Sequence, residues 1–269
     1  MIKDSNAVSE TLGYILLFGI ALTAIAIILL VGNSIIGSEK SQDNFQNIIQ
    51  SFTIIQSDMN QVALEETPVM TTMIHMAGGT IGGNTTAGDL QINYPASSPS
   101  PIYDNDTGRI MFSTDNDLTT TVSIENGGVW QKSSDNNSDT MVSQPRIYVT
   151  PQSDTLVINV IRFNCSQSLT AEAGTGTINI KMMYYNTSID TYQADNNTVK
   201  LSFDTDYPDA WNSYLSSLNG TLVDVDGNTV PVTVNSVITN DNIVSTISPV
   251  SNLLISDHTV NVDFSGFFS

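Results

Sequence analysis

The chain has 269 residues, which is long enough to bury a full hydrophobic core without disulfides or metals. Its 27 acidic and 8 basic side chains give a formal net charge of -19, which opposes binding to nucleic acid. Charged residues make up only 13% of the chain, and the frequent Ser, Thr and Asn favour strands and turns. Because Cys165 is the one cysteine, an intramolecular disulfide is excluded. The composition predicts an extracellular β protein without a nucleic-acid partner.

An apolar segment lies near the N-terminus. No charged residue occurs between Glu10 and Glu39, and residues 12–32 are almost wholly apolar. At about 1.5 Å of rise per residue, a helix of this length matches a hydrocarbon core of about 30 Å. The segment is interpreted as a secretory signal that is cleaved near Gly37, as a plain signal anchor, or as the helix of a particular family.

The family interpretation rests on residues 6–17, NAVSETLGYILL. This stretch resembles the start of archaeal type IV pilin-like proteins with a class III signal peptide, in which a polar leader precedes an AVSE or AVSP block and an apolar helix. Residues 50–63 and 70–81 are similar to a group of uncharacterised archaeal surface proteins with this N-terminus. The resemblance implies that a prepilin peptidase removes a leader, residues 1–7, by cutting between Asp4 and Val8. Such leaders usually carry a basic residue close to the cut, whereas here Lys3 stands farther away.

Glu10 has two interpretations. The resemblance implies that this carboxylate pairs with the N-terminal amine of a neighbouring subunit, which would offset its desolvation inside a filament. Alternatively, Glu10 lies at the level of the lipid headgroups and never enters the hydrocarbon. Only the first interpretation makes Glu10 a residue of assembly.

A heptad-like stripe follows the apolar segment. Apolar residues spaced by 3, 4, 3, 4 and 3 positions predict that the helix continues to Glu65 or Glu66, where Pro68 ends it. The predicted stem helix therefore covers residues 8–66. The stripe either packs against the chain's own β domain or joins the core of a filament. The candidate assembly residues are Glu10, Leu12, Phe45, Ile48, Phe52, Ile55, Met59 and Val62.

Residues 67–269 are predicted to form one β-rich domain. Short apolar runs between turn residues predict strands at 91–94, 108–113, 119–125, 146–150, 155–163, 177–185, 242–248 and 259–264. Hairpin turns are expected at 126–128 and 226–228, a short helix at 207–218, and a flexible loop at the glycine-rich 78–83. The predicted fold class is α+β: the long N-terminal helix followed by a mainly antiparallel, β-sandwich-like ectodomain with one short helix.

Few residues of this chain suit catalysis. His75 and His258 are the two histidines, and His75, in a Met-rich run, is expected to be a packed core residue. The sequence has no nucleophile elbow, phosphate-binding loop or zinc motif, so we expect no enzymatic activity and no cofactor. The weak calcium candidates are Asp224, Asp226 and Asn228, although ordinary turns use the same residues.

Asn-x-Ser/Thr sequons in predicted loops provide glycosylation candidates. Their number matches what the composition produces by chance, so only their position carries information. The candidates are Asn84, Asn105, Asn136, Asn186 and Asn196.

Two functional hypotheses follow. The first is a pilin-like surface protein, either a structural subunit or a minor, adhesin-like component of an archaeal filament, with the membrane and prepilin peptidase as partners. The second is a membrane-anchored extracellular binding or envelope protein that does not polymerise. Both place the β domain outside the cell.

Overall fold

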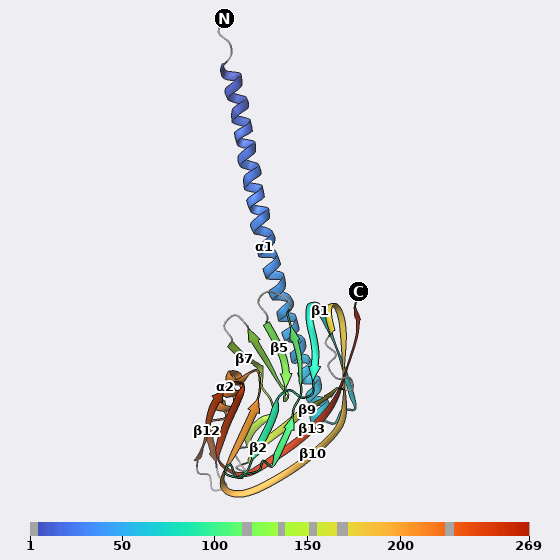
Figure 1. Cartoon of the computed structure of the whole chain (residues 1–269), viewed down its shortest axis with the longest axis vertical. Coiled ribbons are helices and arrows are strands. Elements are labelled where there is room, and N and C mark those ends of the chain that lie inside the picture. The colour runs from blue at the N-terminus through green and yellow to red at the C-terminus, as the bar shows by residue number, and fades with distance from the viewer. Residues whose placement is uncertain are drawn as a thin grey trace. The chain divides into compact units, whose positions relative to one another are not determined.

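The computed structural model describes residues 5–114, 120–133, 138–150, 155–165, 172–223 and 229–268. The chain divides into two compact units, Met1–Asn47 and Ile48–Ser269. The first helix, α1 (Ser5–Leu64), begins in the first unit and ends in the second (Figure 1). The expected stem helix is confirmed to within three residues at each end.

The end of α1 has a local cause. Glu66 adopts a positive φ of 53°, and the amides of Glu65 and Thr67 both donate to the carbonyl of Gln61 at 3.2 Å. The bond from Thr67 spans six positions, one more than the closing bond of a Schellman motif, and the left-handed Glu66 turns the backbone so that it can form. Pro68 follows immediately, and it cannot continue the helix.

The second unit is built mainly of strands, and we call it the β body. In the described residues, thirteen strands join into one hydrogen-bonded sheet. They are β1 (Val69–Asn84), β2 (Asp89–Asn93), β3 (Tyr103–Asp106), β4 (Arg109–Ser113), β5 (Thr120–Glu125), β6 (Gly128–Ser133), β7 (Ser138–Ser143), β8 (Ile147–Thr150), β9 (Thr155–Cys165), β10 (Glu172–Asp204), β11 (Gly220–Val223), β12 (Thr229–Thr239) and β13 (Asn242–Phe268).

Long strands organise this sheet. The main order is β11-β12-β13-β10-β1-β4-β5-β6-β7, and β2 and β3 extend from β10. The described pairs are antiparallel except for β9, which runs parallel to β13. β10 and β13 lie side by side along the β body (Figure 1). Register shifts between Tyr184 and Asn186 and between Gln193 and Asn197 interrupt their ladder. The antiparallel β-rich body is thereby confirmed, while the sandwich arrangement stays a prediction.

The glycine-rich segment 78–83 is a correction. It lies inside β1 rather than in a flexible loop. Gly78 and Gly79 have φ values of 121° and 95° at a register shift. A Cβ on Gly79 would stand 2.5 Å from the Phe112 ring, so the glycine permits close approach of β1 and β4. The rest of β1, all of β3 and β7, and the part of β10 beyond Tyr185 were not predicted from the sequence either.

Two other local predictions are confirmed. Asn126 and Gly127, with φ values of 46° and 70°, form the two-residue turn between β5 and β6. The short helix is α2 (Pro208–Ser217). β11 pairs with β12 as the second hairpin requires, but its turn lies outside the described residues.

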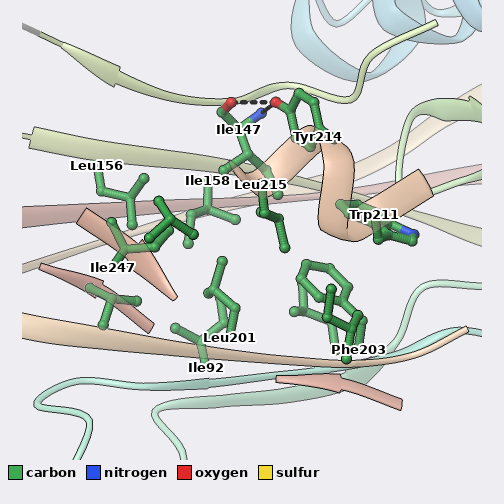
Figure 2. Packing of buried hydrophobic residues seen from close by; sticks show 14 of the residues in the cluster. Ile92, Ile147, Leu156, Ile158, Leu201, Phe203, Trp211, Tyr214, Leu215 and Ile247 are labelled. Carbon is green, nitrogen blue, oxygen red and sulfur yellow. Dashed lines mark hydrogen bonds between the residues drawn. The ribbon is translucent and has the colours of Figure 1, made fainter. Parts of the chain in front are cut away.

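One hydrophobic cluster lies between α2 and the strands. Trp211 stacks on Phe203 and on Trp130, with ring centroids 4.2 and 4.4 Å apart. Figure 2 shows Trp211 and Leu215 of α2 above Phe203 and Leu201 of β10. The Tyr214 hydroxyl bonds the backbone of Ile147, as the dashed lines mark (Figure 2). These contacts hold α2 against the sheet.

Candidate anchoring and assembly site

The segment Leu12–Leu29 of α1 is long and apolar enough to cross a membrane. None of it is buried within the chain, so it is not the core helix of a soluble domain. The hydroxyl of Thr23 donates to the carbonyls of Gly19 and Ile20, at 3.0 and 2.9 Å, and thus needs no water. The segment therefore presents a long, exposed apolar surface.

The candidate assembly residues fall into two groups. Leu12 is 59% exposed and Phe45 is half-buried, while the side chain of Glu10 is outside the described part. Five stripe residues are buried in the β body: Ile48, Phe52, Ile55, Met59 and Val62. Because these five already have partners within the chain, they offer no surface to a neighbouring subunit. For them the packing interpretation holds, and a role in subunit contacts is left to Glu10, Leu12 and Phe45 as a prediction.

Polar bonds also fasten the end of α1. The buried Gln56 donates through Nε2 to the carbonyl of Gly127 at 2.6 Å and to that of Gln144 at 3.0 Å. Asp58 accepts a bond of 2.5 Å from the hydroxyl of Thr72 on β1. Because these partners come from three separate segments, the bonds fix the position of the end of α1. We call this position, at Gln56 and Asp58, the helix seat. In the sequence, the signal for these bonds was the polar Gln56 among the apolar residues of the stripe.

His258 lies at the same seat. Its Nδ1 is 3.0 Å from the Thr187 hydroxyl, its Nε2 is 2.8 Å from the Ser256 hydroxyl, and it bonds the backbone of Ala63 in α1. Burial lowers the pKa of His258 below its usual value near 6.5, although Asp257 opposes this. The buried histidine is thus His258, whereas His75 is exposed on β1 and its expected core role is wrong.

An ion-pair network lies beside the aromatic cluster. Arg109 donates to Glu125 through Nε and Nη2, at 2.9 and 2.7 Å, and also contacts Asp206. The indole of Trp211 donates to Glu125 at 3.1 Å, and the Tyr207 ring lies 5.4 Å from the guanidinium carbon. Burial raises the pKa of Glu125 while Arg109 opposes that effect. The network joins β4, β5 and α2, and it was not foreseen from the sequence.

The other candidates are dispersed. In the described ranges no three acidic, His or Cys side chains gather around a metal position. Asp224, Asp226, Asn228 and Asn136 lie outside those ranges. Burial and Asp263 raise the pKa of the Cys165 thiol, which keeps it protonated.

The sequon residues that the structure describes lie on strands. Asn84 ends β1, and its side chain accepts bonds from the amide and hydroxyl of Thr86 at 3.0 Å. Asn105 of β3 and Asn186 of β10 are exposed, and Asn196 lies in β10 with its side chain undescribed. Strand positions replace the loops expected for Asn84, Asn105, Asn186 and Asn196.

Comparison with known proteins gives a family without a known activity. Residues 6–261 match the family of unknown function DUF7289, and the chain belongs to that family. An uncharacterized protein of Archaeoglobus fulgidus is 32% identical over 101 residues, or 36% of this chain and 33% of the relative. The match thus spans about a third of that relative. No solved structure matches.

Proposed function

We propose that this chain is a type IV pilin-like surface protein of an archaeal cell. Leu12–Leu29 inserts into the membrane, and the acidic β body is a sandwich-like domain on the extracellular side. The chain serves as a structural subunit or a minor, adhesin-like component of a filament, and no catalytic activity is part of the proposal.

The observation that carries the proposal is the exposed apolar surface of Leu12–Leu29. Twelve large apolar side chains in this segment are between 51% and 68% exposed: Leu12, Tyr14, Ile15, Leu16, Leu17, Phe18, Ile20, Leu22, Ile25, Ile27, Ile28 and Leu29. Such a surface requires lipid or other copies of the same helix. The AVSE block directly before it supports a pilin-like leader and a role for Glu10 in assembly.

A second candidate function is a solitary, membrane-anchored binding or envelope protein. The burial of Ile48, Phe52, Ile55, Met59 and Val62 in their own β body favours it. With these side chains occupied, fewer apolar residues of α1 remain for packing between subunits. The anchor alone would then explain the apolar segment.

The first test is the N-terminal residue of the protein isolated from its native membrane, determined by mass spectrometry. A start between Ser5 and Val8 would indicate prepilin-peptidase processing. A retained Met1 would support the solitary anchor, and a start beyond Gly37 would mean that the segment is a cleaved secretory signal.

Assembly is tested separately. Glu10→Gln should abolish filaments, scored by electron microscopy, while the protein stays in the membrane fraction. Glu39→Gln is the matched control, because it changes the next acidic residue of the helix beyond the apolar segment. Filaments that survive Glu10→Gln would contradict the assembly role.

A further inference from the structure

We infer that the β body carries a binding site for a neutral saccharide, in a polar hollow of about 380 Å³. The residues that carry the argument are Asn105 and Asp106 of β3, Arg162 and Asn164 of β9, and Tyr185 of β10. The volume falls within the range of small-molecule sites, about 300–1,000 Å³. This inference goes beyond the proposed function and holds whether or not the chain polymerises.

The fold brings two distant segments together at this hollow. The amide of Phe163 donates to the carbonyl of Thr107 at 2.8 Å, which places β9 beside the end of β3. Gly108 has a φ of 73°, and a Cβ there would stand 3.0 Å from the Cβ of Phe163. The glycine therefore permits the approach that brings Asn105 and Asn164 to the same hollow.

Tyr185 owes its position to a β-bulge. Tyr184 pairs with Val260 and Asn186 pairs with Thr259, so Tyr185 is the extra residue between two consecutive partners on β13. A bulge changes the direction of a side chain, and bulges are common beside binding sites. The Tyr185 side chain is 63% exposed and lines the hollow. Its ring offers an apolar face to the C–H face of a pyranose, and its hydroxyl can bond water or a ligand.

The polar groups are held in place yet keep bonding capacity. Arg162 donates through Nε to Asp257 at 2.8 Å, which leaves its two Nη groups for a ligand. Asn164 donates through Nδ2 to Asn261 at 3.0 Å, which leaves its Oδ1 to accept. Fixed donors and acceptors of both kinds match vicinal hydroxyls, because each hydroxyl both donates and accepts.

The charge balance favours a neutral ligand. Asp257 compensates the guanidinium of Arg162, and Asp106 adds a negative charge at the same hollow. The chain as a whole carries a formal charge of -19. Phosphorylated, sulfated or uronic saccharides would therefore be repelled.

The test uses the full chain in detergent micelles with a panel of free sugars. Glucose, galactose, mannose, N-acetylglucosamine and their β-linked dimers are the neutral probes, and glucuronate and sialic acid are the anionic ones. Binding is detected by saturation-transfer NMR and quantified by calorimetry. Tyr185→Ala and Arg162→Gln should each weaken binding about tenfold, while Tyr185→Phe should retain it.

Ile189→Ala is the matched control, because Ile189 lies on the same strand and is also 63% exposed. It should leave affinity unchanged, and thermal melting must show that every variant is folded. Three outcomes would overturn the inference: no neutral probe binds the folded protein, binding is insensitive to Tyr185→Ala, or only the anionic probes bind. A glycan found covalently attached at Asn105 or Asn164 in the native protein would also overturn it, because that glycan would fill the hollow.

Discussion

Replacing Gln56 by leucine should loosen the helix seat without removing much volume from it. The side chain donates to the carbonyls of Gly127 and Gln144 and is itself buried. Leucine cannot donate, so both carbonyls lose a partner. The carbonyl of Gly127 lies in a buried bond, whereas that of Gln144 is only partly buried and can be hydrated.

The magnitude follows from this difference in burial. Leaving a buried acceptor unsatisfied costs about 1–3 kcal/mol, and losing a partly exposed bond costs about 0.5–1.5 kcal/mol. The apolar gain from leucine offsets part of this sum. We therefore expect Gln56→Leu to lower the free energy of unfolding by about 2–3 kcal/mol. Gln56→Glu should cost more, because its carboxylate would face two acceptors.

The assay is urea unfolding of the full chain in detergent, followed by tryptophan fluorescence. Both tryptophans, Trp130 and Trp211, are buried in the β body, so the signal reports the unit that contains the seat. Gln50→Leu, an exposed glutamine on the same helix, is the control and should change stability by less than about 0.5 kcal/mol. Equal effects of Gln56→Leu and Gln50→Leu would refute the reasoning.

Three other perturbations have defined outcomes. Arg109→Met should lower the free energy of unfolding by about 3–5 kcal/mol, because it leaves Glu125 buried without its counter-ion. Adding Glu125→Leu should recover much of this loss in the same unfolding assay. His258 has a lowered pKa in the folded state, so unfolding takes up a proton as the pH falls below about 6.5, and stability should decline from there. His258→Gln should flatten that decline when thermal melting is measured at pH 7.5 and 5.5. In urea titrations, Phe52→Ala should lower the free energy of unfolding by about 3–5 kcal/mol, whereas Ile54→Ala, on the exposed side of α1, should leave it nearly unchanged. Similar losses for the two variants would mean that the stripe is not packed.

Features with a local cause could be predicted from the sequence. The end of α1 before Pro68, the turn at Asn126 and Gly127, and the helix at 208–217 each depend on residues a few positions apart. Their backbone preferences act on immediate neighbours, so no distant contact is needed. The apolar segment Leu12–Leu29 belongs with them, because length and composition alone define it.

The predictions for His75 and for residues 78–83 were wrong because they relied on sequence neighbours alone. His75 lies in a Met-rich run, but strand alternation buries Ile74 and Met76 and exposes His75. The glycines of 78–83 suggested a loop, yet they let β1 approach Phe112. The side of its own strand decided the environment of His75, and a contact with another strand decided that of the glycines.

The sequence by itself determined an apolar helix able to span a membrane, a stem that ends at Pro68, and an acidic, β-rich remainder, because these depend on composition and local backbone preference. Only the tertiary structure decided that the stripe is buried in its own β body, that Gln56 and His258 meet at the helix seat, and that Asn105, Arg162 and Tyr185 share one hollow. The register of strands far apart in the chain sets these meetings, and a register emerges only when the whole sheet is paired.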